Sequence, residues 1–380
     1  MEIPAGCIRW PYITSTNPGS CYHLTVKGGA YLTINNGTLT VTNDYENNGT
    51  LTMNSSYGVL NVDRDLKFNI GSTCNVTTAA NIYVQRYVEF HIGSTINMGT
   101  GILTLDGSIH GYIRTYAPTS IYRLRSDKDD GFASGIGSNS TAVLTILENI
   151  YVLAGSTFNH YYAGTTILQG SLYVYDGAIM NFNQGTLSME GNVNKTIHIV
   201  NISNDLNNLV INKSAGYGVT LSYPIQIYAS LTIQSGYISP GVNSISIRGN
   251  WINNVGSGGF IEGSGTVVVN GGLDQTFSTE TFNILELSKT GGALLVPTGS
   301  TIYCSSYNWT AGNLSVAGGT FSAVDLVDPG IYGTVTLSSG LIEYQQDSAQ
   351  YCDLYGTLTI SGGTFKVFGT QGVNYLSGDG

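Results

Sequence analysis

Carboxylates are the residues of this chain most able to do chemistry, because cleavage of a polysaccharide needs clustered acids that donate and accept protons. The 24 Asp and Glu residues are instead scattered along the sequence. Asp63 and Asp65 flank Arg64 at a predicted turn, and we expect them to hold that turn. Glu89 and Asp106 are expected on adjacent turns of the repeat described below, as solvated charges. Neither pair predicts a catalytic site, so we expect no enzymatic activity.

The histidines and the densest acidic cluster give no other reactive arrangement. None of the five histidines has a spacing to Ser or Cys that suggests a triad, and His91 and His160 fit outward strand positions. Asp127, Asp129 and Asp130 lack the fifth-position acid and the distal glutamate of a calcium loop, which favours a solvated charged loop. No CxxC motif or His–Cys cluster indicates a metal, and we expect no cofactor.

The five cysteines allow two disulfides. Cys7 and Cys21 are close enough in sequence to close a short loop, while Cys304 and Cys352 are separated by about two turns of the repeat. Cys74 stands where a neighbouring copy of the repeat has isoleucine, so we expect it in the core. Buried free thiols are the alternative to both bonds, and the odd count leaves one thiol or one bond between subunits.

A repeat of about two dozen residues must position all these side chains. Its three clearest copies begin at Gly312, Gly333 and Gly356. Each copy has a glycine, alternating apolar residues, a Ser/Gly turn and a second apolar pair. A unit this short cannot bury its own core and must stack on its neighbours. The sequence therefore predicts an all-β β-solenoid with roughly 21–23 residues per turn.

Weaker copies extend the repeat through most of the chain. Apolar residues alternate with Thr, Ser, Tyr and Asn, which predicts strands with one buried and one wet face. Fifty glycines, with many Asn and Ser residues, supply the corners. A longer echo aligns Lys213 with Lys289, between three and four turns later in the sequence. This echo suggests that a block of several turns has been duplicated.

Breaks in the repeat divide the chain into four predicted segments. Residues 1–28 form a non-repetitive N-terminal cap or attachment segment, and residues 29–113 form a first stretch of solenoid. Residues 114–140 form a charged loop excursion, and residues 141–380 continue the solenoid to an apparently uncapped C-terminus. Since solenoids place contacts on such excursions, we expect the charged segment to contact other subunits through Arg123, Arg125, Asp127, Asp129 and Asp130.

Composition narrows the classes of partner. The net charge is −10, and between residues 214 and 380 only Arg248, Lys289 and Lys366 are basic, which argues against nucleic acid. No stretch is apolar enough to insert into a membrane. The first residues are not a signal peptide, so an exported form would have a leader that is removed or lies outside this chain. An acidic surface rich in Thr, Ser, Asn and Tyr fits an extracellular setting.

Ten Asn-x-Ser/Thr sequons also fit an extracellular setting, although a chain rich in these residues generates many by chance. These candidate glycosylation sites are Asn36, Asn48, Asn54, Asn75, Asn139, Asn194, Asn201, Asn212, Asn308 and Asn313. Aromatic side chains are expected to face outward as well, where they stack on sugars or on one another across strands. The members of this group are Tyr83, Tyr87, Tyr151, Tyr173 and Tyr175.

Several sequence segments of the repeat resemble the repeats of prokaryotic cell-surface β-helix proteins, which include adhesin-like proteins and proteins of sheaths and surface layers. They include Leu209-Val-Ile-Asn-Lys-Ser, Leu231-Thr-Ile-Gln-Ser-Gly and Gly265-Thr-Val-Val-Val-Asn-Gly. The resemblance is clearest over residues 200–380 and looser over residues 29–192. It implies a right-handed parallel β-helix, export and a role outside the cell, and it transfers no site residues.

Together these observations predict an extracellular structural protein. We expect it to self-assemble into a filament, sheath or surface layer through solenoid stacking and lateral contacts, with copies of itself as its main partner. The alternative is an adhesin or receptor-binding fibre that recognises glycans. A polysaccharide-cleaving β-helix enzyme is the third interpretation.

Overall fold

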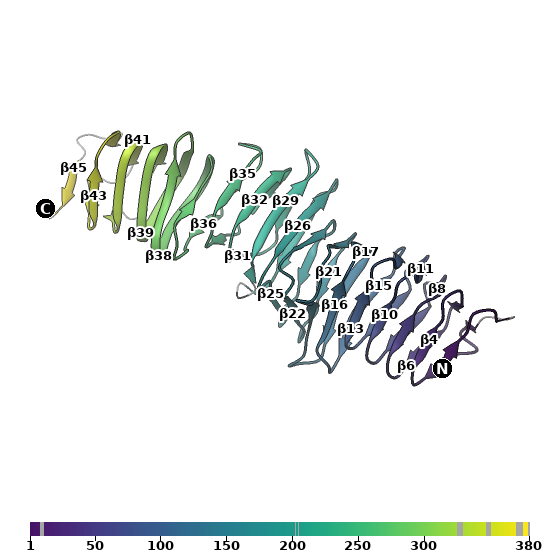
Figure 1. Cartoon of the computed structure of the whole chain (residues 1–380). Helices are drawn as coiled ribbons and strands as arrows, with labels where there is room; N and C mark the ends of the chain where they lie inside the picture. Colours follow the sequence, from purple (N-terminus) through teal and green to yellow (C-terminus); the bar gives the residue numbers. More distant parts are fainter. Residues whose placement is uncertain are drawn as a thin grey trace. The chain divides into compact units, whose positions relative to one another are not determined.

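The chain folds as the predicted parallel β-solenoid, of about 16 turns, and no helix occurs among the residues that the structure describes. The computed structural model describes residues 1–7, 11–201, 203, 205–324, 330–346, 351–369 and 375–378. Figure 1 shows the strands stacked side by side within each of two compact units. Unit 1 comprises Met1–Glu190 and His198–Asn204, and unit 2 comprises Gly191–Ile197 and Asp205–Gly380. The hand of the coil stays a prediction.

Each turn of unit 1 contributes three short strands, one to each of three faces. The first face holds β1 (Glu2–Ile3), β4 (Leu24–Val26), β7 (Tyr45–Asn47), β10 (Leu66–Phe68), β13 (Tyr87–Phe90), β16 (Gly111–Thr115), β19 (Ala133–Ile136), β22 (Thr157–His160) and β25 (Ile179–Asn181). The second holds one sheet of β2 (Tyr12–Ile13), β5 (Tyr31–Ile34), β8 (Thr50–Met53), β11 (Thr73–Val76) and β14 (Thr95–Asn97), then another of β17 (Thr119–Ile121), β20 (Leu144–Ile146), β23 (Thr165–Leu168) and β26 (Thr186–Gly191). The third holds β3 (Gly19–Cys21), β6 (Thr38–Val41), β9 (Val59–Val62), β12 (Asn81–Val84), β15 (Ile102–Gly107), β18 (Arg123–Lys128), β21 (Ile150–Val152) and β24 (Leu172–Val174).

The core of unit 1 is a set of apolar columns, because parallel register places like positions of successive turns on top of one another. Phe68 pairs with Phe90 in the ladder, and their rings stack with centroids 5.6 Å apart. Cys74 lies between Leu51 and Ile96 and is fully buried, which confirms its predicted place in the core. Burial raises the pKa of the Cys74 thiol to about 12.

Unit 2 begins with the same three-strand turn. Its first face holds β28 (Asp205–Leu206), β31 (Ile225–Ile227), β34 (Ile245–Ile247) and β36 (Thr266–Val269). The short β37 (Gln275–Thr276) continues the face that holds Trp251, since Phe277 forms a β-bridge with that residue. The other two faces hold β29 (Asn208–Lys213), β32 (Leu231–Ser235) and β35 (Trp251–Asn253), and β27 (Lys195–Ile199), β30 (Gly218–Leu221) and β33 (Tyr237–Ser239).

Longer strands replace this pattern from residue 280 onward, where successive arms of a turn join into one bent strand. They are β38 (Glu280–Pro297), β39 (Thr301–Val324) and β41 (Thr334–Gln346), and the last pairs with both β43 (Thr357–Ile360) and β44 (Thr364–Gly369). A separate sheet holds β40 (Gly330–Ile331), β42 (Tyr351–Leu354) and β45 (Tyr375–Gly378). Register shifts in the pairing of β38 with β39 mark the bends.

The turn length varies more widely than the three clearest copies of the repeat predict. Val267 pairs with Leu285, which is a shorter step than any between those copies, whereas Leu124 pairs with Ile150, which is a longer one. The prediction was correct for the copies on which it was based, since Leu314 pairs with the equivalent Val335 of the next copy. Corners of different length account for the variation, because strand pairing constrains the strands and leaves the connections free.

Both predicted breaks in the solenoid differ from the structure. Residues 1–28 contain β1 to β4, of which β1 pairs with β4 and β3 pairs with β6. Residues 114–140 contain β17, β18 and β19 in parallel register with later turns. Arg123, Arg125 and Asp127 occupy outward positions of a normal alternating strand, since Leu124 and Ser126 are buried between them, whereas Lys128 is itself buried. The predicted uncapped C-terminus includes residues 370–374 and 379–380, which lie outside the described residues.

The echo between Lys213 and Lys289 corresponds to a repeated local packing in unit 2. Both lysines are buried, with 1% and 3% of their surface exposed. A glycine of the following turn lies against each: a Cβ added at Gly236 would meet the Cβ of Lys213 at 2.6 Å, and one added at Gly312 would meet the Cβ of Lys289 at 2.5 Å. Because the two glycines have the same spacing in sequence as the two lysines, the spatial arrangement supports the inferred duplication.

Candidate functional site

A groove on the first face of unit 2 is built from one residue of each of four successive turns. Ile227, Ile247, Val269 and Leu287 are consecutive partners in the ladder and point into the core. Because side chains alternate along a strand, the residue that directly follows each of these four faces outward. These four residues form a column, with neighbours about 4.8 Å apart, and they are Tyr228, Arg248, Asn270 and Ser288.

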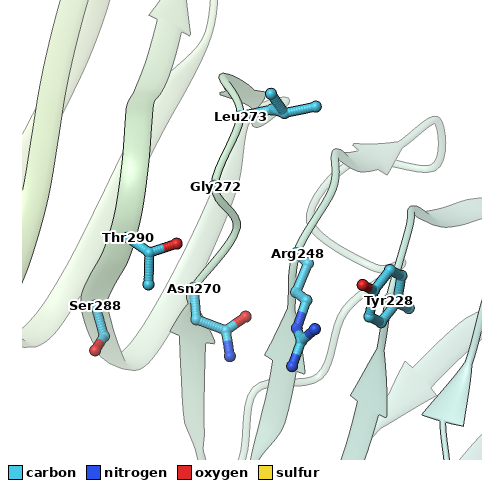
Figure 2. A pocket seen from close by; sticks show the side chains of 7 residues that line it. All are labelled: Tyr228, Arg248, Asn270, Gly272, Leu273, Ser288 and Thr290. Atoms are coloured by element: carbon cyan, nitrogen blue, oxygen red, sulfur yellow. The ribbon is translucent and has the colours of Figure 1, made fainter.

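Figure 2 shows this column as a row of side chains, with Thr290 beside Ser288 and with Gly272 and Leu273 along one edge. These seven residues line a groove with a volume of about 580 Å³. Tyr228 and Leu273 are 53% and 81% exposed, so the groove has an aromatic and an aliphatic wall that both meet solvent. We call it the Arg248 groove.

One cation dominates the electrostatics of the Arg248 groove. The guanidinium of Arg248 lies over the ring of Tyr228, 4.6 Å from its centroid. Asp205 is two turns away in the adjoining column; burial raises its pKa, and the charge of Arg248 opposes that shift. The amide of Asn270 donates to the Ser246 hydroxyl at 2.8 Å, while its Oδ1 is buried and has no partner in the described part of the chain.

A buried polar network supports the segment that forms the edge of the groove. Gln275 is fully buried; its Oε1 accepts from the backbone N–H of Gly271, and its amide donates to the carbonyls of Ile247 and Gly249. The ammonium of Lys289 donates to the carbonyls of Gly271 and Leu273, at 3.1 and 2.8 Å, and to Gln275 Oε1. Burial lowers the pKa of Lys289 to about 8.

The chemistry of the Arg248 groove is that of recognition. It offers one guanidinium, one phenol ring with its hydroxyl, and the hydroxyls of Ser288 and Thr290, which are groups that orient a ligand. The groove was not predicted from the sequence, although Tyr228, Arg248 and Asn270 each directly follow an Ile-x-Ile or Val-Val-Val strand. Successive members of this set are one turn of the repeat apart. Aligning the turns of the repeat in the sequence would therefore have placed the three residues in one column.

A second groove, of about 470 Å³, lies on the third face of unit 1 and is acidic. Asp63 and Asp106 line it two turns apart, with Gln85 between them donating to Asp63 Oδ1 at 3.4 Å. Burial raises the pKa of Asp106, and the charge of Lys128 opposes this shift. Tyr83, one of the predicted outward aromatics, is also in its lining.

Comparisons with protein-family models, with curated proteins and with solved structures gave no match. The resemblance to cell-surface β-helix proteins stays a prediction in all respects other than the solenoid fold. Among the described residues there is no group of three or more His, Cys, Asp or Glu side chains placed to hold a metal. The same residues include no helix with the length and hydropathy needed to cross a membrane.

The acids singled out in the sequence are separated by the fold. Glu89 lies on the first face of unit 1 and Asp106 on the third face of the same turn, so the expectation that they lie on adjacent turns was wrong. The residue one turn after Glu89 is Arg114, so Asp106 is reached before the turn is complete and falls on a different face. Glu89 accepts from Arg114 at 2.9 Å instead. Asp65 accepts two hydrogen bonds from Arg86 and, although burial opposes it, Arg86 lowers the Asp65 pKa.

The charged residues of the 114–140 segment are engaged mostly within the solenoid. Arg123 forms an ion pair with Glu148 of the next turn. Lys128, which is 3% exposed, donates to the carbonyls of Gln85 and Asp106, and burial lowers its pKa to about 8. Arg125 lies opposite Tyr151 in the ladder. The side chains of Asp127, Asp129 and Asp130 are exposed, and their predicted contact with other subunits stays a prediction.

Three of the five predicted outward tyrosines form one cluster on the third face of unit 1. Tyr151 and Tyr173 stack with their ring centroids 5.3 Å apart, and Tyr175 lies 6.4 Å from Tyr173. The ring of His198 is 5.8 Å from that of Tyr173. Tyr87 lies on another face, under the guanidinium of Arg114. The tyrosines of the cluster thus stack on one another, as the cross-strand interpretation predicts.

Cysteines and sequons complete the predicted sites. Cys7, Cys21 and Cys304 are free thiols in the structure, which lends no support to a Cys7–Cys21 bond. The side chain of Cys352 lies outside the described residues, so its pairing with Cys304 stays a prediction. All ten sequon asparagines are exposed or half-buried, so none would have to leave the core to carry a glycan.

His160 is buried, which corrects its predicted outward position. The carbonyl of Gln184 accepts from Nδ1 at 3.1 Å, so Nε2 accepts from the hydroxyl of Thr166 at 2.8 Å. The imidazole also stacks on Phe182 with centroids 4.4 Å apart. A neutral histidine can lie in the core when both of its ring nitrogens form hydrogen bonds. The alternation of apolar and polar residues in the sequence does not show whether such partners are present. Burial lowers its pKa to about 4.

This burial makes the stability of unit 1 depend on pH. In the unfolded chain a histidine binds a proton below pH about 6.5, whereas folded His160 stays neutral down to about pH 4. Stability from this residue is therefore complete above pH 6.5 and falls, by up to about 3 kcal/mol, as the pH approaches 4. Urea unfolding between about pH 7 and pH 4.5 should show that His160→Gln flattens this dependence. Carboxyl groups titrate in both proteins and contribute equally to the change of stability with pH. If His160→Gln and the wild type show the same change, His160 is not its source.

Proposed function

We propose that this chain is an extracellular structural protein, a β-solenoid scaffold that assembles with copies of itself into a filament, sheath or surface layer. The observation that supports this function best is the use of charged side chains as links between turns. A protein that serves as a scaffold needs turns that do not separate, and a catalyst needs charges that are free to react with substrate.

Ion pairs in unit 1 join residues of neighbouring turns. The first face carries a column of alternating sign in ladder register, from Glu46 through Lys67 and Glu89 to Arg114. Opposite charges on adjacent strands stabilise a sheet, whereas like charges in these positions destabilise it. Neutralised columns of this kind also leave the uncharged Thr, Asn and Tyr positions as the surface that neighbouring copies would contact.

Electron microscopy and sedimentation velocity of the purified full chain test the proposal. We expect particles longer than one chain to appear as the concentration rises. Reversing a charge in the proposed contact segment, with Asp127→Lys, should raise the concentration needed for assembly. The matched control is Asp176→Lys, an exposed acid outside that segment. A wild-type chain that remains monomeric at the highest accessible concentration would contradict self-assembly.

Glycan recognition is the second candidate function, favoured by the stacked cluster of Tyr151, Tyr173 and Tyr175. Stacked rings held by strands present a rigid aromatic surface at low entropic cost, which suits contact with the apolar face of a sugar. A glycan array probed with the monomeric chain tests this candidate. Signals that are lost in Tyr173→Ala would support it, and an array without signals would argue against it.

A further inference from the structure

We infer that the Arg248 groove of unit 2 binds a carboxylated sugar residue of an acidic polysaccharide. The proposal goes beyond self-assembly and does not depend on it. It rests on the groups that the four-residue column brings together, on the charge of their surroundings and on the direction in which the column runs.

Arg248 is the only arginine of unit 2, and its charge is available at the groove. Its side chain is half-buried beside Tyr228, and it forms none of the ion pairs found in the described part of the chain. Lys289, the other cation of this region, is committed to Gln275 and two backbone carbonyls. A guanidinium presents donors in a planar fork that matches a carboxylate, so it is the group that selects an acidic ligand.

The remaining groups match the rest of a sugar ring. The ring of Tyr228 is 53% exposed and offers an apolar surface. Ser288 and Thr290 provide hydroxyls that donate hydrogen bonds to a ligand or accept them from it. The uncharged groups thus hydrogen-bond the hydroxyls of the sugar, while Arg248 binds its carboxylate.

The column also runs across the turns, along the direction in which they stack. Successive members are about 4.8 Å apart, so a linear ligand lying in the groove meets a new side chain at each turn. Solenoids bind extended ligands along such faces. The groove therefore fits a segment of a chain better than a single compact molecule.

The surrounding charge argues against double-stranded nucleic acid as the ligand. Between residues 214 and 380 ten acids face three bases, a balance that disfavours a duplex with one phosphate charge about every 1.7 Å of its axis, whereas a single carboxylated sugar places one charge beside Arg248. Asp205 and Glu286 are the acids in the columns beside Arg248, and Glu286 accepts from the amide of Asn308. Asp205 competes with a bound carboxylate for Arg248. Removing its charge should therefore strengthen binding.

Isothermal titration of the full chain with trigalacturonate tests the proposal. The matched ligand is its methyl ester, which keeps the shape and hydroxyls and removes the charge. We expect Arg248→Gln to weaken trigalacturonate binding by about 10-fold or more, the value of a hydrogen bond to a charged group. Arg64→Gln, at an exposed arginine of unit 1, should leave binding unchanged. Asp205→Asn should tighten it by a few-fold.

Three outcomes would overturn the inference. They are equal affinity for the acid and its ester, an Arg248→Gln variant that binds as the wild type does, and no heat of binding at millimolar trigalacturonate. Hydrogen exchange of β34 and β36 in each variant checks that the column keeps its structure. Assembly is measured separately on the same samples, so loss of binding and loss of self-association are distinguishable.

Discussion

Gln275→Leu should lower the local stability of unit 2 by about 4 kcal/mol, because several buried groups lose their partners together. The amide of Gln275 bonds the backbone at Gly271, Ile247 and Gly249, and it accepts from the ammonium of Lys289. Leucine fills a similar volume and makes none of these bonds. Hydrogen-exchange mass spectrometry of the full chain measures the effect where it occurs, in β34, β36 and β38.

A second variant separates this network from a general loss of packing. Lys289→Met alone should destabilise the same strands by about 3 kcal/mol, since it leaves the Gly271 and Leu273 carbonyls without their donor. The double variant should cost less than the sum, because each single change already disrupts the shared bond. Gln234→Leu, at an exposed glutamine, is the control and should stay within about 0.5 kcal/mol of the wild type. Strict additivity would show that the two side chains act independently.

The network links stability to the proposed ligand site. Gly271 and Leu273 belong to the segment that forms one edge of the Arg248 groove, and both are held by Lys289. A groove on a loop alone would close or shift with the loop. Here a buried cation and a buried amide fix that loop to the strands below, which is how a site gains a constant shape.

The sequence predicted the solenoid well because alternation and stacking are local and repeated constraints. Leu314, Val335 and Leu358 stand at equivalent positions of the three clearest copies, and the structure pairs them in one column. The sequence predicted the sites poorly, because a site in a solenoid depends on which residues of different turns share a face. Turns of unequal length shift that correspondence, as the different steps from Val267 to Leu285 and from Leu124 to Ile150 illustrate.

Charge and polarity misled the sequence analysis for a related reason. The 114–140 segment was predicted as an excursion because its charges are dense, yet Arg123, Arg125 and Asp127 alternate with buried residues as in any other strand. His160 was predicted outward because it is polar, yet Gln184 and Thr166 satisfy both of its ring nitrogens. In both places the missing information was the identity of the partner that the fold supplies, such as Glu148 for Arg123 and Gln184 for His160, each about one turn away.

The glycines that open the three clearest copies have a structural reason that the sequence did not show. A Cβ added at Gly333 would lie 1.6 Å from the carbonyl oxygen of Gly312, and one added at Gly356 would lie 1.9 Å from that of Gly333. These distances are far below any real contact, and the atoms met are backbone atoms that cannot rotate away. The three glycines thus form a column where successive turns approach too closely for any side chain.

Gly333→Ala should therefore destabilise the surrounding strands by about 3 kcal/mol or more, the upper part of the range for overpacking. The methyl group can be accommodated only if β39 and β41 move apart, which weakens the ladder between Leu314 and Val335. Faster hydrogen exchange in both strands, with a lower urea midpoint, is the expected result. Gly258→Ala is the matched control, since a Cβ there meets nothing within 4 Å. Equal protection of these strands from hydrogen exchange in the two variants would mean that the turns can separate at this column without loss of stability. Close approach of the backbone would then not explain the glycines.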